Sequence, residues 1–235
     1  MPNTRLTPDQ IQRSAIHAAL GDPHRLAIVE ALLHTDRAPS DLAHDLGLES
    51  NLFTHHVDQL ERVGIVRRIR STGDGRRRYL TLVRAALDSP KVTSQATAGS
   101  VLFVCTENSA RSQLAAAILR STSQVQVASA GTHPAKSVHP QAVRVAARHG
   151  LDLSGAKPAH LQTVGFTPDF LITVCDRAHE ELQPPAGHRL HWSVPDPAAA
   201  NTPAAFERAF RDIAERVDSF VRSLGPSPRL VREAQ

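Results

Sequence analysis

The residues best suited to chemistry are a cysteine and an arginine with five residues between them, Cys105 and Arg111. They follow an apolar run, Val101–Val104, of the kind found in buried parallel strands, and a helix-like stretch begins directly after them. Backbone N–H groups between a strand end and a helix N-terminus bind one small anion, and an arginine grips two of its oxygens. The same surroundings stabilise a cysteine thiolate. The spacing therefore predicts a nucleophilic thiol at an oxyanion site rather than a buried structural cysteine.

The elements around this pair alternate between strand-like and helix-like patterns. Apolar runs at 125–131, 170–174 and 190–192 predict strands, and periodic apolar residues at 139–149 and 206–220 predict helices. Such alternation is typical of an α/β domain with a parallel sheet, whose site lies at the carboxyl ends of the strands. Cys175, the only other cysteine, follows the strand predicted at 170–174.

The first half of the chain has a different pattern. Helical periodicity predicts four helices, with Ser40 and either Ser50 or Asn51 as candidate helix caps. Two β-prone runs around Gly73-Asp74-Gly75 predict a hairpin, which carries seven arginines and one acid between Ile65 and Arg84. These elements predict a winged helix-turn-helix, mostly α with a β wing, that binds DNA with its second helix in the major groove.

Length and composition limit the alternatives. The 235 residues allow one large domain or two small ones, and we expect domains at 1–88 and 100–226, a linker within 85–100 and a frayed tail at 225–235. Without a long apolar stretch or signal segment, we expect a soluble, cytoplasmic protein with no membrane partner. Two cysteines exclude a disulfide scaffold and a thiolate-only metal site, and no metal site is predicted.

The first half resembles the arsenic-repressor (ArsR/SmtB) family over about residues 10–84. The resemblance rests on GDPHRLAIVEALL, on SDLAHDLGLESNLFTHHVDQLERVGIV and on the arginine hairpin. It implies a homodimer on a palindromic operator, with a recognition helix at about 51–63. The residues expected to contact DNA are Asn51, Leu52, Thr54, His55, Arg76, Arg77 and Arg78. We expect His55 to point outward and His56 to pack inward. This half has no cysteine, so the thiol sensor common in that family is absent.

The second half resembles the low-molecular-weight protein tyrosine phosphatases, and in particular their arsenate reductase branch. Four motifs carry the likeness: VLFVCTENSARSQLAAAIL, SAGTHPAKSVHPQAV, LITVCDRAHEEL and HWSVPDPAAA. The resemblance implies a four-stranded parallel sheet, Cys105 as nucleophile, Ser112 as its hydrogen-bond partner, Asp196 as general acid and Cys175 as resolving thiol. It also implies that Arg111 and an anion-binding loop hold arsenate or phosphate. The loop residues are Thr106, Glu107, Asn108, Ser109 and Ala110.

The favoured reaction is reduction of arsenate to arsenite, which leaves a Cys105–Cys175 disulfide. It needs no bound cofactor but an external thiol reductant: thioredoxin, glutaredoxin or a mycothiol-type donor. Two alternatives stay open, a phosphatase fused to a DNA-binding module and a non-catalytic oxyanion or redox sensor that controls DNA binding.

Three departures from the family pattern bear on this choice. Leu182 stands where thioredoxin-coupled relatives have a third cysteine, and Ala198-Ala199 replaces the aromatic pair that clamps phosphotyrosine. The charge of Glu107 would oppose ionisation of Cys105.

Overall fold

The computed structural model describes residues 6–87, 99–182 and 188–224. The chain divides into two compact units, one formed by residues 1–70 and 77–90 and the other by 71–76 and 91–235. The expected domain boundaries stay a prediction. Most of the expected linker, residues 88–98, and the expected tail, 225–235, lie outside the described residues.

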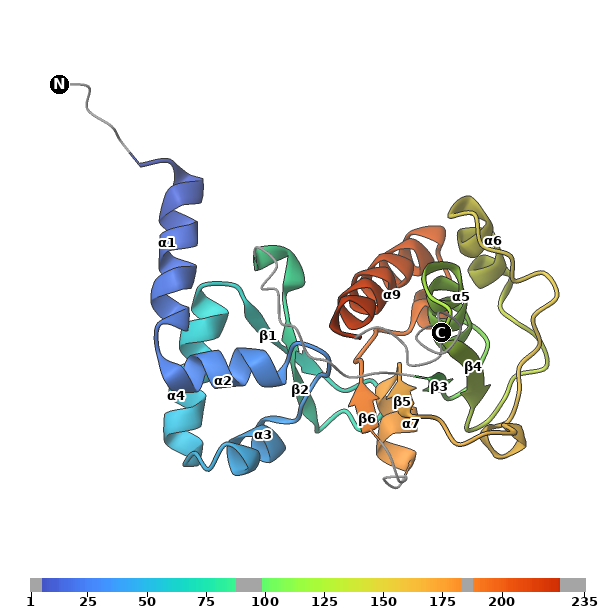
Figure 1. The fold of residues 1–235 in the computed structure, drawn as a ribbon, viewed down its shortest axis with the longest axis horizontal. Coiled ribbons are helices and arrows are strands. Elements are labelled where there is room, and N and C mark those ends of the chain that lie inside the picture. Colours follow the sequence, from blue (N-terminus) through green and yellow to red (C-terminus); the bar gives the residue numbers. More distant parts are fainter. Residues whose placement is uncertain (1–5, 88–98, 183–187, 225–235) are drawn as a thin grey trace, which may run out of the picture. The chain divides into compact units, whose positions relative to one another are not determined.

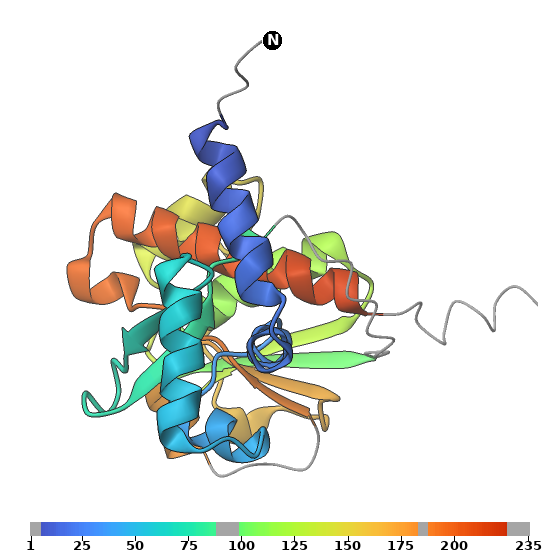
Figure 2. The same ribbon diagram turned by 90° about the vertical axis from the view of Figure 1, so that its left-hand side faces the viewer.

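The described part of the first unit forms four helices followed by a two-stranded antiparallel sheet (Figure 1). Its elements are α1 (Pro8–Leu20), α2 (Pro23–Ala31), α3 (Pro39–Asp45), α4 (Ser50–Arg62), β1 (Val66–Arg70), β2 (Arg78–Leu82) and the 3-10 turn η1 (Arg84–Ala86). Helices α1, α2 and α4 contact one another, and Figure 2 shows them grouped at the front of this unit. Their core includes Ile28, Leu32, Val57 and Leu60, all fully buried. These are the helices and the hairpin expected from the sequence; their assignment to a winged helix stays a prediction.

Helix α1 and helix α2 begin at side-chain caps, whereas α3 and α4 do not. Thr7 and Gln10 form a capping box at α1, and the Asp22 carboxylate accepts two backbone N–H groups at the start of α2. The predictions that Ser40 and Ser50 or Asn51 act as caps are wrong. Pro39 already occupies the first turn of α3, and Ser50 itself begins α4, so their N-cap residues are Ala38 and Glu49.

The second unit contains a four-stranded parallel sheet with the strand order β4-β3-β5-β6. Its elements are β3 (Ser100–Cys105), α5 (Arg111–Thr122), β4 (Gln126–Gly131), α6 (Pro140–Arg148), η2 (Leu161–Thr163), β5 (Phe170–Thr173), α7 (Asp176–Glu181), β6 (His188–His191), α8 (Pro197–Ala200) and α9 (Pro203–Ser223). The sequence prediction of an α/β domain with such a sheet is confirmed.

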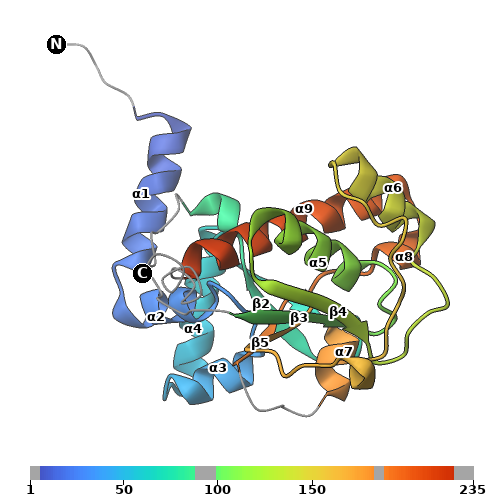
Figure 3. The same ribbon diagram turned by 45° about the vertical axis from the view of Figure 1, so that its right-hand side comes forward.

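Helices cover both faces of this sheet. Figure 3 shows α5 and α9 on one face and α7 on the other. Every residue of β3 is buried, as expected for a central parallel strand, and Phe103 packs against Trp192, the only tryptophan of the chain. This core fixes the carboxyl ends of β3 and β5, after which the reactive residues follow.

Among the described residues, none of the helices has the length and apolar character that crossing a membrane requires.

Candidate active site

The loop between β3 and α5 is held with its carbonyl groups turned toward a neighbouring segment. The carbonyl oxygens of Cys105, Thr106, Glu107 and Ser109 accept hydrogen bonds of 2.8–3.1 Å. The donors are the backbone N–H groups of Thr132, His133, Ala135 and His139. Because the C=O and N–H of one trans peptide point in opposite directions, the N–H groups that follow these carbonyls point to the inside of the loop. The loop is thus built to receive an anion.

The thiol of Cys105 lies inside this loop and is buried. Its Sγ accepts the backbone N–H of Asn108 at 3.1 Å and lies 3.0 Å from Ser112 Oγ. The structure thus places Ser112 beside Cys105. Ser112 Oγ also accepts from the Asn108 side chain, so the sulfur, the hydroxyl and the Asn108 amide lie in one hydrogen-bonded group.

Asn108 holds the loop in place through its side-chain hydrogen bonds, and its backbone adopts a left-handed conformation with φ 51°. The side chain is fully buried; its Nδ2 donates to Ser112 Oγ at 2.8 Å, and its Oδ1 accepts from Gln113 Nε2 and from the Ala159 backbone N–H. Asparagine tolerates a positive φ better than most residues, and every polar atom of its amide is used. The sequence did not indicate Gln113 and Ala159 as partners of Asn108, because no local pattern shows which distant groups form hydrogen bonds with a side-chain amide.

Arg111 begins α5, and its guanidinium is directed across to the loop that follows β6. Its Nη1 donates to the Val194 carbonyl at 3.1 Å, and its Nη2 forms a 3.2 Å ion pair with Asp196 Oδ2. Asp196 also caps α8, since its Oδ1 accepts the Ala198 N–H, and its side chain is 40% exposed. The structure therefore brings together the predicted anion-binding arginine and the predicted general acid.

Cys175 lies next to the loop, at the end of the strand beside β3. Val104 pairs with Thr173 in the parallel register, and the Val174 N–H donates to the Val104 carbonyl. Cys105 directly follows Val104, and Cys175 directly follows Val174. The Cys175 Sγ is 3.5 Å from Thr106 Oγ1 and accepts from the Ala178 N–H at 3.4 Å.

Burial raises the pKa of the Cys175 thiol, because its neutral form needs no solvation. Arg111 opposes this shift, and a charge on Cys105 adds to it. Cys175 is therefore a protonated thiol at neutral pH.

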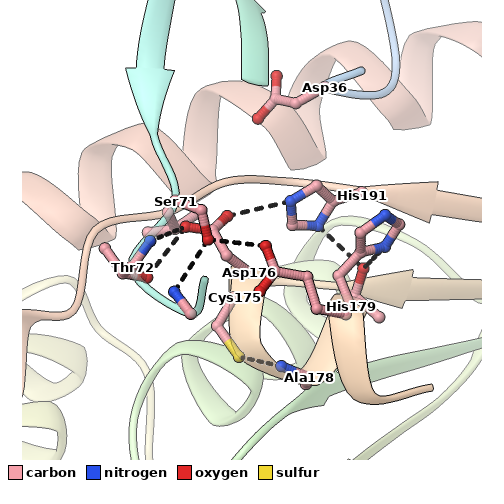
Figure 4. Close-up of polar contacts among 12 residues, drawn as sticks. Asp36, Ser71, Thr72, Cys175, Asp176, Ala178, His179 and His191 are labelled. Atoms are coloured by element: carbon pink, nitrogen blue, oxygen red, sulfur yellow. Dashed lines mark hydrogen bonds and ion pairs between the residues drawn. The ribbon is translucent and has the colours of Figure 1, made fainter. Parts of the chain in front are cut away.

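A buried polar network follows Cys175 (Figure 4). Asp176 Oδ1 is 3.1 Å from His191 Nε2, and its Oδ2 accepts both the backbone N–H and the hydroxyl of Thr72, at 2.7 and 3.0 Å. Thr72 is part of the segment 71–76 that belongs to this unit. The sequence analysis did not single out Asp176 or His191.

The pKa of Asp176 is set by opposing effects. Burial raises it, but hydrogen bonds from His191, Ser193 and the Thr72 backbone outweigh burial and lower the pKa to about 2. The value is below the unfolded one of 3.8, so the stabilisation is present above pH of about 4 and is lost as pH falls toward 2.

Replacing Asp176 with asparagine is expected to lower the free energy of unfolding of the second unit at neutral pH by about 2 kcal/mol. The variant should also lose less stability than wild type between pH of about 4 and 2. Denaturant unfolding followed by Trp192 fluorescence measures both, since that side chain is buried in this unit. Asp218→Asn, at an exposed position, serves as the control. An Asp176→Asn variant as stable as wild type at neutral pH would show that the hydrogen bonds to Asp176 do not stabilise the fold.

Gly131, the last residue of β4, allows the closest approach of strand and loop. A Cβ at this position would lie 2.6 Å from the Thr106 carbonyl oxygen and 3.0 Å from the Asn108 nitrogen. Both atoms are backbone, so the loop itself must move to make room. Gly131→Ala is expected to lower kcat/KM by at least about tenfold, because misplacement of a catalytic loop by an ångström costs this much or more. Gly155→Ala, which meets no atom within 4 Å, should leave kcat/KM unchanged.

The remaining predicted loop residues have distinct positions. Glu107 is exposed and accepts the Ser109 hydroxyl at 3.1 Å, so its carboxylate is solvated and engaged by a donor. Ala110 is the N-cap of α5. Leu182, at the position where thioredoxin-coupled relatives have a third cysteine, directly follows α7 and packs, partly buried, against the core.

The residues predicted to contact DNA are exposed. Asn51, Leu52, Thr54 and His55 lie along α4, whereas His56 is buried as expected; Arg76, Arg77 and Arg78 lie at and before the start of β2. Two other arginines of the hairpin are engaged within the first unit. Arg68 pairs with Asp58 and Glu61, and Arg84 donates to the Leu33 carbonyl, so the charge offered to a partner is smaller than the sequence tally suggested.

Two curated relatives and one solved structure are similar to the second half of this chain. An arsenate reductase of Bacillus licheniformis is 31% identical over 134 residues, covering 53% of this chain and 96% of that relative. Arsenate reductase 2 of Staphylococcus epidermidis is 29% identical over 126 residues, covering 52% and 95%. A crystal structure of arsenate reductase from Archaeoglobus fulgidus matches with 30% identity and a TM-score of 0.46, covering 52% of this chain and 98% of that one.

The family model of the low molecular weight phosphotyrosine protein phosphatases matches residues 100–229, more than half of the chain. This range contains the loop, both cysteines and Asp196, whose arrangement is described above. The chain therefore belongs to the low molecular weight phosphotyrosine protein phosphatase family and carries an enzyme domain of that family in its second half.

Proposed function

We propose that the second unit reduces arsenate to arsenite with its two cysteines. The observation that carries the proposal is the placement of a second buried, unpaired thiol at the end of the strand adjacent to the one that ends in Cys105. A phosphatase needs only the first thiol, the arginine and an acid. The arsenate reductases among the relatives described above support the same choice.

The first step forms a bond between the Cys105 sulfur and arsenic(V). The loop amides and Arg111 bind the oxyanion, and an arsenate oxygen leaves as water after taking a proton from Asp196. The product is a thiol–arsenate adduct in which arsenic is still pentavalent. Loss of the Cys105 negative charge removes one of the causes that raise the pKa of Cys175, so adduct formation prepares the second thiol to ionise.

In the second step the Cys175 thiolate attacks the sulfur of Cys105. The sulfur–arsenic bond breaks, and its electron pair stays on arsenic, which leaves as arsenite. The two thiols are oxidised to one disulfide while arsenic gains two electrons, so the step is balanced. An external thiol must then reduce the disulfide, and thioredoxin, glutaredoxin and a mycothiol-type thiol are the candidates to assay.

Turnover assays with the full chain test this proposal. Arsenite release from arsenate should depend on a thiol donor and exceed one equivalent per chain. Hydrolysis of p-nitrophenyl phosphate without any arsenite release would instead assign the unit to the phosphatases.

We further propose that the first unit is a winged-helix DNA-binding module that acts as a homodimeric repressor on a palindromic operator. The exposed polar residues along α4 and the exposed Arg76, Arg77 and Arg78 support contacts with base edges and phosphates. Leu6 and Ile11, which are 65% and 56% exposed, offer apolar area for a second copy.

Replacing Arg76, Arg77 and Arg78 together with alanine is expected to weaken duplex binding and to flatten its salt dependence. Each lost phosphate contact lowers the slope of log K against log salt by about 0.9, so the three together lower it by up to about 3. Fluorescence anisotropy with a duplex selected from a random library measures the slope. A variant of exposed arginines on α6 and α9, Arg144, Arg208 and Arg211, removes the same charge and should keep the wild-type slope. Equal slopes for both variants would contradict the proposal.

A further inference from the structure

Three side chains with metal-ligating atoms converge in the first unit, at the start of α2 and on the inner face of α4. The ligand atoms of Asp22, His24 and His56 all lie within 4.8 Å of one another. Asp22 Oδ1 is 3.9 Å from His24 Nδ1 and 3.7 Å from His56 Nδ1. The two imidazole rings have centroids 5.2 Å apart and are tilted by 34°. Among the described residues, this is the one such group of three.

His56 has a polar side chain that the fold leaves without a hydrogen bond. It is 5% exposed, and neither Nδ1 nor Nε2 has a hydrogen-bond partner among the described atoms. A buried polar group without a partner costs free energy, so it calls for an explanation. Its Nδ1 lies 3.7 Å from the carboxylate oxygen Oδ1 of Asp22, which is beyond hydrogen-bond distance. This gap suits a cation that binds both groups rather than a direct bond between them.

We infer that Asp22, His24 and His56 form a binding site for a divalent transition-metal ion such as Zn²⁺. Two imidazoles and one carboxylate are ligands that Zn²⁺ takes readily, and three protein ligands leave a fourth position for water. The side chains of Asp22 and His24 are 28% and 50% exposed, so the ion can enter from solvent.

The protonation states of the cluster favour a cation. Desolvation lowers the pKa of His56, so its ring is neutral at neutral pH and keeps a lone pair. The Asp22 pKa is lowered chiefly by the Arg25 N–H, so the carboxylate is charged. The positive charge of Arg25, 3.9 Å from Asp22 Oδ2, would repel a bound cation. Its guanidinium is, however, held by hydrogen bonds to the carbonyls of Ala18 and Ala19 at the end of α1.

A bound ion would join α2 to α4, since His56 comes from one helix and its two partners from the N-terminus of the other. Binding to the folded chain alone adds stability that grows with metal concentration. Metal binding should therefore be visible both as a stoichiometric complex and as a rise in melting temperature.

The experiment titrates Zn²⁺, and in parallel Co²⁺, into the full chain without an affinity tag. The background carries Cys105→Ser and Cys175→Ser, so that thiolates cannot bind the ion. Isothermal calorimetry gives the stoichiometry, and the visible d–d bands of Co²⁺ report a nitrogen- and oxygen-ligated site. We expect one ion per chain and a higher melting temperature.

Two variants and a control locate the site. His24→Ala and Asp22→Asn should each weaken binding by at least about tenfold and remove the thermal shift. Asparagine at position 22 keeps an oxygen for the two backbone N–H groups, so α2 retains its cap. His44→Ala, which removes an exposed histidine of α3, should bind as the background does. The inference is overturned if no ion binds at concentrations stoichiometric with the chain, or if either Asp22→Asn or His24→Ala keeps full affinity.

Discussion

Replacing Cys105 with serine is expected to abolish both arsenate reduction and phosphatase turnover, with a fall in kcat of at least about three orders of magnitude. A serine hydroxyl is a much weaker nucleophile than a thiolate, and no neighbouring base in the loop would activate it. A thousandfold loss corresponds to about 4 kcal/mol of transition-state stabilisation. Initial rates of arsenite release and of p-nitrophenyl phosphate hydrolysis measure it.

The same variant should still fold and bind phosphate. Serine occupies less volume than cysteine, and its hydroxyl can accept the Asn108 N–H that Sγ accepts in the wild type. Unchanged thermal unfolding and retained phosphate binding are the controls. Residual turnover above one per cent of wild type, with a folded protein, would remove Cys105 from the role of nucleophile.

Replacing Cys175 with serine is expected to separate the two activities. Hydrolysis of p-nitrophenyl phosphate should stay within about threefold of wild type, because it uses the loop, Arg111 and Asp196 alone. Arsenate reduction should fall by at least about three orders of magnitude, since no second thiolate of the chain remains to attack the Cys105 sulfur and break its bond to arsenic. Arsenate reduction that persists in this variant would show that an external thiol attacks the adduct instead.

The pH dependence of the wild type offers an independent check on Cys175. Its pKa is raised, first by burial, so the attacking thiolate becomes more abundant as pH increases above neutrality. The reduction step should therefore accelerate with pH in single-turnover measurements. Phosphate ester hydrolysis lacks that step and should not show the same rise.

The fold of the second unit follows from patterns that the sequence carries locally. The apolar run before Cys105 becomes β3, with every residue buried, and the arginine five residues further on begins α5. Periodic apolar residues likewise marked α6 and α9, because packing against a sheet requires one apolar face. The sequence also allowed the prediction that the two cysteines lie close together, because each follows a predicted strand and adjacent parallel strands end at the same edge of the sheet.

What the sequence could not reveal are contacts between segments far apart in the chain. Asn108 meets Ala159, Arg111 meets Val194, and Asp22 approaches His56, although no spacing rule joins these residues. The cap predictions at Ser40 and Ser50 failed because capping depends on where the backbone turns into the helix, which residue type alone does not determine. The charge of the hairpin was overestimated because Arg68 finds two carboxylates on α4.

Mass spectrometry of the full chain after arsenate, in the absence of any reductant, tests the central claim most directly. The account predicts one arsenite released per chain, a mass lower by about 2 Da, and a peptide pair joined through Cys105 and Cys175. Phosphate in place of arsenate should leave both thiols free for alkylation. Arsenite release with both thiols still open to alkylation, or no bridged peptide after arsenate, would contradict the two-cysteine mechanism.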